Sequence, residues 1–203
     1  MKEYPSISRQ IDRSLQIYAF DKLDGSNIRV EWSRKAGFYK YGSRTCLMDA
    51  NHPELGQAVG LIESKYAQVL SDLFCKERWD HVVAFFEFFG TSSFAGQHKK
   101  DESHDVVLID VAENKKGIMP PNDFVRTFGH LHIPAVVHIG RAGVEFEQSV
   151  RDGTLPGMTF EGVVCKGVRK GRHLTMFKIK SEAWINRLRE FCKGDDRLFQ
   201  KLL

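Results

Sequence analysis

Alternating hydrophobic and polar residues predict β-strands along much of the chain. Residues 27–32 place Ile28, Val30 and Trp32 on one side and Arg29 and Glu31 on the other, as in a half-buried strand. Other apolar or β-branched runs predict strands over residues 17–22, 37–42, 81–89, 106–111, 135–139, 159–166 and 174–179.

Three segments have the periodicity or start signals of helices. Apolar residues at helical spacing predict an amphipathic helix over residues 54–74. Pro120 and Pro121 open a second helix that reaches about His130, and Ser181 opens a last amphipathic one. Mainly antiparallel strands with a few helices predict an α+β fold, in one domain over residues 1–203 with a short helical segment at 181–203.

Composition narrows the class of protein. The 203 residues are 42% hydrophobic and 28% charged, which is ordinary for a globular chain and excludes a disordered or fibrous one. No apolar run approaches the ~20 residues that cross a bilayer, and the N-terminus lacks a signal-peptide core. The lack of such a run predicts no membrane partner. Four scattered cysteines without a CxxC pair predict a reduced, cytoplasmic protein and argue against a four-cysteine zinc site.

Positive charge is concentrated near the C-terminus. The formal net charge is +4, and residues 161–203 contain 11 Lys and Arg against 5 Asp and Glu. A solvated helix face and a phosphate-binding wall both fit this distribution. Apart from Lys178 and Lys180, the basic residues of this region that could line a phosphate backbone, as a polynucleotide track, are Arg169, Lys170, Arg172, Arg187, Arg189 and Lys193.

The first candidate for chemistry is the segment from Lys22 to Asn27. It places a lysine at the end of an apolar strand and an Asp-Gly turn directly after it. A strand end holds the amine rigidly, and the turn can aim backbone amides at an anion. Because Asp-Gly is also a common hairpin turn, the segment alone does not distinguish a site from a simple connection.

Four further segments repeat this combination of apolar strand and ionisable residue. Glu87 lies inside the run Phe86–Gly90, and Asp110 ends the run that begins at Val107. Glu161 opens a strand that reaches Lys166, and Lys178 and Lys180 share one face of another. Each has an ordinary explanation as a solvated strand end or outer face, but a buried carboxylate is costly without a partner.

Taken in order, these segments resemble the motifs of the covalent nucleotidyltransferase superfamily of ATP-dependent DNA ligases, RNA ligases and capping enzymes. The chain looks most like the nick-sealing RNA ligase branch. The resemblance implies an ATP-grasp-like adenylation domain of antiparallel sheets with flanking helices and no OB domain. The matching segments are Lys22–Gly25 (KxDG), Ser43–Thr45, Phe86–Gly90, Leu108–Asp110, Glu161–Val164 (EGxV) and Lys178–Lys180 (KxK).

The resemblance implies a three-step reaction. Lys22 attacks the α-phosphorus of ATP and forms lysyl-AMP, the AMP moves to a 5′-phosphate end, and a 3′-hydroxyl then displaces it to seal the strand. Positive charge on Lys178 and Lys180 would disfavour the ammonium form of Lys22 and hold the α-phosphate. Glu161, and secondly Asp24, are the candidate ligands for Mg²⁺ or Mn²⁺.

The same resemblance assigns residues to the nucleotide. Glu87 would hold the ribose, Arg44 a phosphate or sugar, and Asn27 a phosphate oxygen. Ile109 and Val164 would sandwich the adenine, where many relatives have an aromatic residue at or near Ile109. Backbone groups around three consecutive residues would select adenine: Asp21, Lys22 and Leu23.

The short segment that follows the KxK motif distinguishes only some of the possible ligase types. Residues 181–203 can form one helix or two short ones and cannot form an OB barrel, which argues against a full DNA ligase or a capping enzyme. A minimal ligase, a domain that works with a partner protein, and a chain that lacks a C-terminal domain all stay open. The expected substrates are RNA or DNA ends or nicks. A minimal DNA ligase and an inactive nucleic-acid-binding module of the same fold are the alternatives to an RNA ligase.

Overall fold

The computed structural model describes residues 3–91, 102–114, 116–169 and 173–203. Its contacts divide the chain into two compact units. Unit 1 comprises the described parts of Met1–Ser6, Gly25–Ser92 and Lys99–Ile133. Unit 2 comprises Ile7–Asp24 and the described parts of Pro134–Leu203. The chain crosses from unit 2 to unit 1 directly after Asp24, so each unit contains segments that are far apart in sequence.

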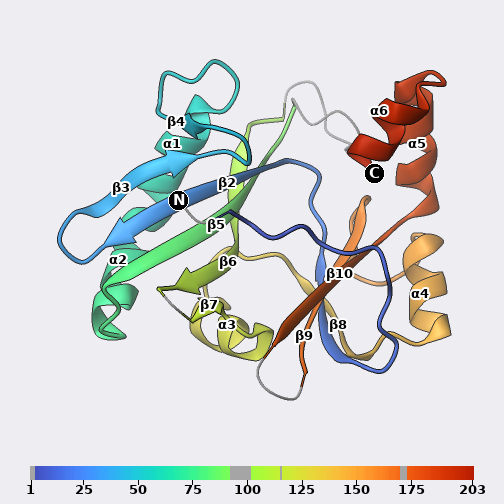
Figure 1. Cartoon of the computed structure of the whole chain (residues 1–203), viewed down its shortest axis with the longest axis horizontal. Helices are drawn as coiled ribbons and strands as arrows, with labels where there is room; N and C mark the ends of the chain where they lie inside the picture. Colours follow the sequence, from blue (N-terminus) through green and yellow to red (C-terminus); the bar gives the residue numbers. More distant parts are fainter. Residues whose placement is uncertain (1–2, 92–101, 115, 170–172) are drawn as a thin grey trace. The chain divides into compact units, whose positions relative to one another are not determined.

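Unit 1 is an antiparallel six-stranded sheet in the order β4-β3-β2-β5-β6-β7 (Figure 1). Its strands are β2 (Ser26–Ser33), β3 (Gly37–Gly42), β4 (Leu47–Met48), β5 (His81–Phe89), β6 (Asp105–Glu113) and β7 (Gly117–Ile118). Its helices are α1 (Gly56–Ile62), the π-helical η1 (Glu63–Ala67), α2 (Gln68–Lys76) and α3 (Pro121–Phe128).

The core of unit 1 lies between the sheet and its helices. Ile28, Val30 and Trp32 are buried, as their alternation predicts. Rings join the layers edge to face: Trp32 contacts Phe74 of α2, with centroids 5.2 Å apart. Aromatic pairs of this kind add to the stability that burial supplies.

The prediction of a half-buried strand β2 is wrong for Arg29, which is also buried. The N-terminal segment covers this face of the sheet. Its Tyr4 ring packs edge to face on Phe85, the β5 partner of Arg29, with centroids 5.0 Å apart. Its Glu3 carboxylate lies 3.6 Å from Nη1 of Arg29. Other segments of the chain therefore cover both faces of β2, and the alternation within residues 27–32 does not predict the second covering.

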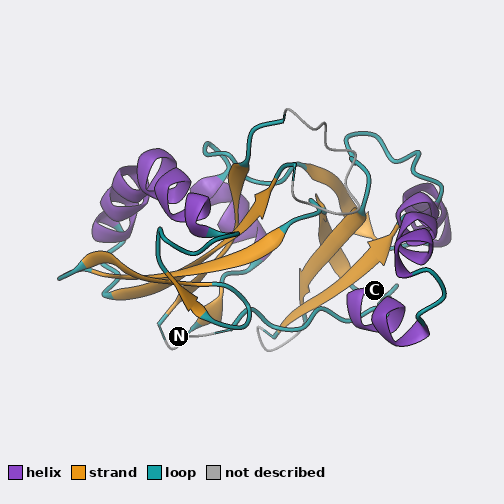
Figure 2. Cartoon of the chain, turned by 90° about the horizontal axis from the view of Figure 1, so that it is seen from above, coloured by secondary structure: helices purple, strands orange, loops and turns teal. Residues whose placement is uncertain are grey.

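Unit 2 is an antiparallel four-stranded sheet in the order β10-β9-β1-β8. Its strands are β1 (Gln16–Asp21), β8 (Val136–Arg141), β9 (Gly162–Val168) and β10 (Leu174–Lys180). Its helices are α4 (Val144–Arg151), α5 (Glu182–Cys192) and α6 (Asp196–Leu202), and Figure 2 shows them beside the strands.

One face of the unit 2 sheet is the core. Ile17 and Ala19 of β1, Val163 and Cys165 of β9 and Phe177 of β10 pack in one cluster. Phe146 and Val150 of α4 complete this cluster. Because side chains alternate along a strand, Phe20, Val164, Lys178 and Lys180 lie on the opposite face.

The α+β class and the antiparallel sheets are confirmed, and all eight predicted strands are present. Several boundaries and elements differ from the prediction, among them the unpredicted two-residue strands β4 and β7. Strand β9 begins at Gly162 and not at Thr159, a π-helical turn interrupts the helix predicted over 54–74, and α4 was not predicted. Helix α4 has eight residues and buries only Phe146 and Val150, which is too short a pattern to identify.

In the part of the chain that the structure describes, no helix is long and apolar enough to cross a membrane. The four cysteines are all free, with Cys46 and Cys75 exposed and Cys165 and Cys192 buried.

Candidate active site

Three of the predicted motifs converge on one carboxylate in unit 2. Lys22 follows β1, Glu161 precedes β9, and Lys180 ends β10. Nζ of Lys22 lies 2.8 Å from Oε2 of Glu161, and Nζ of Lys180 lies 2.9 Å from Oε1 of the same residue. The Glu161 side chain is only 4% exposed. The two ion pairs supply the partners that a buried carboxylate requires.

Backbone hydrogen bonds fix the positions from which these side chains extend. The N–H of Lys22 donates to the carbonyl of Gly162 (2.9 Å), and the N–H of Asp21 donates to that of Ala135 (2.8 Å). Gly162 has φ +132°, and a Cβ there would lie 2.1 Å from the carbonyl oxygen of Ile179. Only glycine therefore allows β9 and β10 to approach this closely beside Glu161.

Lys180 lies in a largely dry environment. Burial, together with the nearby charges of Lys22 and Lys178, lowers its pKa to about 8, while Glu161 opposes the change. Lys180 is thus close enough to interact electrostatically with both Lys178 and Lys22.

Lys178 has a different partner from Lys180. Its Nζ donates a hydrogen bond of 2.8 Å to the carbonyl oxygen of Leu203, beyond α6. Its Cα partner on β9 is Val164, which in turn pairs with Phe20 of β1. The half-buried Val164 therefore shares a sheet face with Lys178.

Asp21 and Leu23 border the lysine. The Asp21 carboxylate accepts hydrogen bonds from the N–H (2.8 Å) and hydroxyl (3.1 Å) of Thr159. Burial raises the pKa of Asp21, against the effect of these bonds. Leu23 and Asp24 are half-buried in the connection after β1. The N–H groups of Asp21 and Lys22 both donate within the protein.

Unit 1 brings together two of its four predicted residues. Asn27 of β2 and Glu87 of β5 are Cα partners, so their side chains lie on one face of the sheet. Ile109 is half-buried at an irregularity of β6, where the pairing with β5 shifts between Phe85 and Phe86. Arg44 is exposed in the loop between β3 and β4.

The face of unit 1 that carries Asn27 and Glu87 holds further buried polar groups. Asp110 pairs with Phe85 and is fully buried, and the Tyr4 hydroxyl donates a hydrogen bond to its carboxylate. Burial and this carboxylate raise the pKa of Tyr4 well above its usual value. The sequence identifies Asp110 as unusual, but Tyr4 has no local signal because its contact spans 106 positions.

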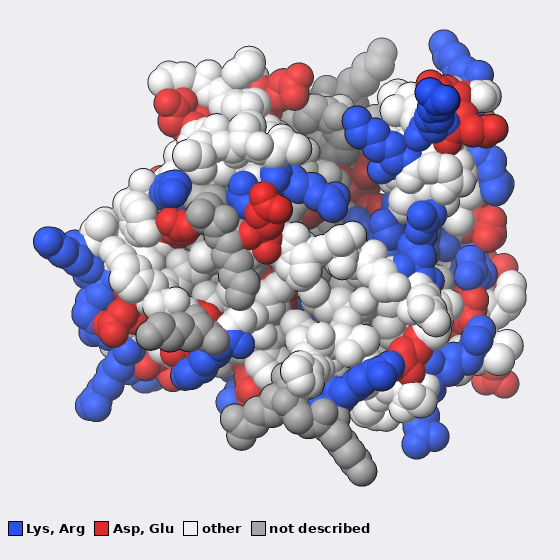
Figure 3. Space-filling view, in the orientation of Figure 1, with Lys and Arg blue, Asp and Glu red and all other residues white. Residues whose placement is uncertain are grey.

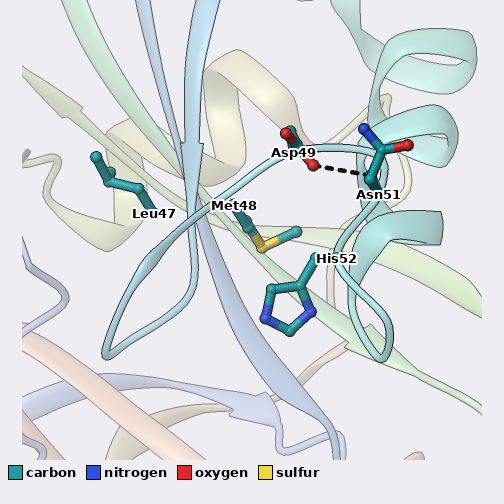
Figure 4. A pocket seen from close by; sticks show the side chains of 5 residues that line it. All are labelled: Leu47, Met48, Asp49, Asn51 and His52. Carbon is teal, nitrogen blue, oxygen red and sulfur yellow. Dashed lines mark hydrogen bonds between the residues drawn. The ribbon is translucent and has the colours of Figure 1, made fainter.

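A separate pocket of about 360 Å³ lies in unit 1 near the start of α1 (Figure 4). Its lining consists of Leu47, Met48, Asp49, Asn51 and His52. The Asp49 carboxylate accepts a 2.8 Å hydrogen bond from the N–H of Asn51. None of the residues predicted from the sequence lines this pocket. Among the described residues, no three His, Cys, Asp or Glu side chains are grouped to hold a metal ion.

Fold comparisons define the class of protein whose architecture the chain shares. The fold is that of the nucleotidyltransferase domain of ATP-dependent polynucleotide ligases. An archaeal ATP-dependent RNA ligase superimposes with a TM-score of 0.71 at 16% identity, over 100% of this chain and 56% of that one. The apo form of a mutant Naegleria gruberi RNA ligase gives a TM-score of 0.65 at 13% identity, over 94% of this chain and 58% of that one.

A putative ATP-dependent DNA ligase from Aquifex aeolicus is also similar, with a TM-score of 0.65 at 14% identity over 99% of this chain and 57% of that one. Two further structures of mutant Naegleria gruberi RNA ligase with the same fold contain AMP and Mn, and ATP and Mn. No protein-family model and no curated protein matches the sequence. The chain spans under three fifths of the length of the ligases it resembles.

Proposed function

We propose that this chain is an ATP-dependent RNA ligase of the covalent nucleotidyltransferase superfamily, with Lys22 as its nucleophile. The observation that carries the proposal is the pair of contacts by which Glu161 joins Lys22 (2.8 Å) and Lys180 (2.9 Å). Three segments with ligase-like motifs thus meet at a single carboxylate. The shared fold supports the same class of reaction.

In the first step, the neutral Nζ of Lys22 attacks the α-phosphorus of ATP. A nitrogen–phosphorus bond forms, the bond from phosphorus to the bridging oxygen breaks, and pyrophosphate leaves with the electron pair. The proton that Nζ loses passes to water, to which the Lys22 side chain is 20% exposed. Lys178 and Lys180 favour the neutral amine and offset the negative charge that develops on the α-phosphate.

The remaining steps use the polynucleotide. An oxygen of the 5′-phosphate attacks lysyl-AMP, which releases Lys22 and leaves an AMP-capped end. The 3′-hydroxyl then attacks the 5′-phosphorus, AMP leaves, and the strand is sealed. RNA is the proposed substrate because RNA ligases share the fold. The similarity to the putative DNA ligase keeps nicked DNA as the second candidate.

Further residues are proposed to bind the nucleotide. Glu87 and its cross-strand partner Asn27 are proposed to bind the ribose and a phosphate oxygen, since they share one face. Arg44 is assigned to a phosphate or sugar. Ile109 and Val164 are each proposed to contact adenine, and the carbonyl groups of Asp21, Lys22 and Leu23 to select it.

A divalent cation fits the residues present. Mg²⁺ is usually held by one or two carboxylates together with substrate phosphates, and not by a cage of protein ligands. Glu161 and Asp24 supply two such carboxylates, and the described residues contain no larger cluster of ligands. We propose that these two residues hold Mg²⁺ or Mn²⁺ with the phosphates of ATP. The ion would neutralise part of the phosphate charge.

Incubation with Mg²⁺ and ATP that is radiolabelled at its α-phosphate tests the proposal. We expect an acid-labile labelled band on a denaturing gel for the parent protein and no band for Lys22→Ala. Lys22→Arg is the matched control, because it keeps a cation beside Glu161 but removes the nucleophilic amine, and it should also stay unlabelled. An unlabelled parent protein would contradict the proposal. Parallel sealing assays on nicked RNA and nicked DNA decide between the two substrates.

A further inference from the structure

The indole ring of Trp184 lies directly against the ammonium group of Lys180. Nζ of Lys180 is 3.2 Å from the ring centroid, well inside the ~6 Å range of cation–π attraction. Trp184 is 1% exposed, and the Lys180 side chain is 8% exposed. Such contacts are strongest where water is excluded, as it is around these two residues.

The segment between the two residues fixes the ring in place. Ser181 caps α5, because its Oγ accepts the N–H of Trp184 (3.1 Å) and donates to the carbonyl of Phe160 (2.6 Å). The N–H of Ser181 donates to the carbonyl of Glu161 (3.0 Å). Trp184 also packs with Leu188 and Cys192 of α5. The same backbone therefore anchors the ring and the carboxylate that flank Lys180.

Lys180 is consequently held from two sides. Glu161 contacts its ammonium at 2.9 Å, and the other charges that act on it are Lys22 after β1 and Lys178 on β10. Glu161 is shared with Lys22, and an incoming phosphate competes for the same ammonium protons. The uncharged ring contacts the cation through its π face, and phosphate does not compete for that face.

We propose that Trp184 is a positioning residue for adenylylation, which holds the Lys180 ammonium where it contacts the α-phosphate of ATP. This inference rests on the proposed function of Lys22 and Lys180. A ring that preorganises a cation for the transition state affects the rate constant of the chemical step. A residue that only stabilises the fold affects the amount of active protein.

Single-turnover labelling of Trp184→Leu and Trp184→Phe separates these two roles. Leucine keeps an apolar side chain but has no π face, and we expect its rate constant to fall about tenfold with the final labelled fraction unchanged. Phenylalanine keeps a π face and should stay within about threefold of the parent. Equal rate constants for Trp184→Leu and the parent would overturn the inference.

Leu188→Ala is the matched control, since it removes packing from the same cluster but leaves the ring. We expect it to lower the melting temperature and to leave the rate constant of the folded protein unchanged. A tenfold fall in this variant as well would assign the effect to packing and overturn the inference.

NMR of the parent tests the contact without any change at Trp184. The ring should shift the ε-methylene protons of Lys180 upfield, and the signal is assigned by its loss in Lys180→Arg. Unshifted protons would also overturn the inference.

Failure of the proposed ligase function can be distinguished from failure of the Trp184 inference. If the parent is not labelled, the affinity for the analogue α,β-methylene-ATP is measured by calorimetry in the same variants. Binding that is about tenfold weaker in Trp184→Leu, with Trp184→Phe close to the parent, supports the positioning of Lys180 for phosphate. Equal affinities overturn that role, and a parent that binds no analogue overturns both proposals.

Discussion

At the scale of residues, Glu161 determines how charge is arranged in unit 2. Its carboxylate is buried and pairs with both Lys22 and Lys180. The motif pattern identifies all three residues, because each is an ionisable group at the end of an apolar strand. Their pairing was not predictable, since Lys22 and Glu161 are 139 positions apart. The register of β1, β9 and β10 determines which carboxylate oxygen of Glu161 contacts Lys22 and which contacts Lys180.

Glu161→Gln tests this arrangement. The change leaves two neighbouring lysines without their shared counter-charge, and Lys180 stays buried. We expect a loss of about 3 kcal/mol in the free energy of unfolding and the loss of labelling by ATP. Urea denaturation measures the first effect. Glu190→Gln, the same change at an exposed position of α5, should alter stability by less than about 0.5 kcal/mol. Equal stability of the two variants would contradict the ion-pair arrangement.

At the scale of elements, most strands follow from alternation, but their exact ends and their irregularities do not. The helix predicted over residues 54–74 contains a π-helical turn at Glu63–Ala67. Within that turn, the buried Tyr66 hydroxyl lies 2.8 Å from the carbonyl oxygen of His132 and 3.2 Å from that of Val106. Helical periodicity predicts the apolar face of the helix. It does not predict that the Tyr66 hydroxyl bonds to carbonyl groups 40 and 66 positions away.

The junction of β9 and β10 depends on Gly162. A side chain there would meet the Ile179 carbonyl at 2.1 Å in a backbone conformation that L-residues rarely adopt. We expect Gly162→Ala to cost more than about 2 kcal/mol of unfolding free energy and to abolish labelling, because Glu161 and Lys180 flank this contact. Thermal denaturation and the ATP assay measure both effects.

Gly60→Ala is the corresponding control within α1, where a Cβ would meet nothing within 4 Å. Alanine is the better helix former, so this variant should gain about 0.5–1 kcal/mol. A Gly162→Ala variant with parental stability and labelling would show that the close approach of the two strands is not required.

At the scale of the whole molecule, the C-terminal excess of positive charge divides into groups with different environments. Lys178 and Lys180 belong to the candidate site. Arg169 pairs with Asp12, whereas Arg187, Arg189 and Lys193 are exposed on α5 or at its end. Figure 3 shows basic side chains gathered over the region of α5 and α6, with acidic ones among them. Lys170 and Arg172 of the predicted track lie outside the described residues.

The exposed group on α5 is predicted to bind the polynucleotide backbone. Replacing Arg187, Arg189 and Lys193 together by Gln should weaken binding of single-stranded RNA. It should also reduce the slope of log affinity against log salt by roughly 2, as expected for three lost phosphate contacts. Labelling of Lys22 by ATP should not change. Lys35, Lys76 and Arg78 are exposed in unit 1, and their replacement by Gln removes the same net charge. An equal effect of the two triple variants would show only a general effect of net charge.

The sequence by itself determined the α+β class, the eight principal strands and the identity of the motif residues. Alternation and strand-end charges are local patterns, and they persist whatever the chain folds against. Only the tertiary structure decided that Glu161 joins Lys22 to Lys180, that Lys178 bonds to Leu203, and that Trp184 lies over Lys180. It also decided that Arg29 is buried. These outcomes depend on strand register and on which segment covers which face, and both depend on residues distant in the chain.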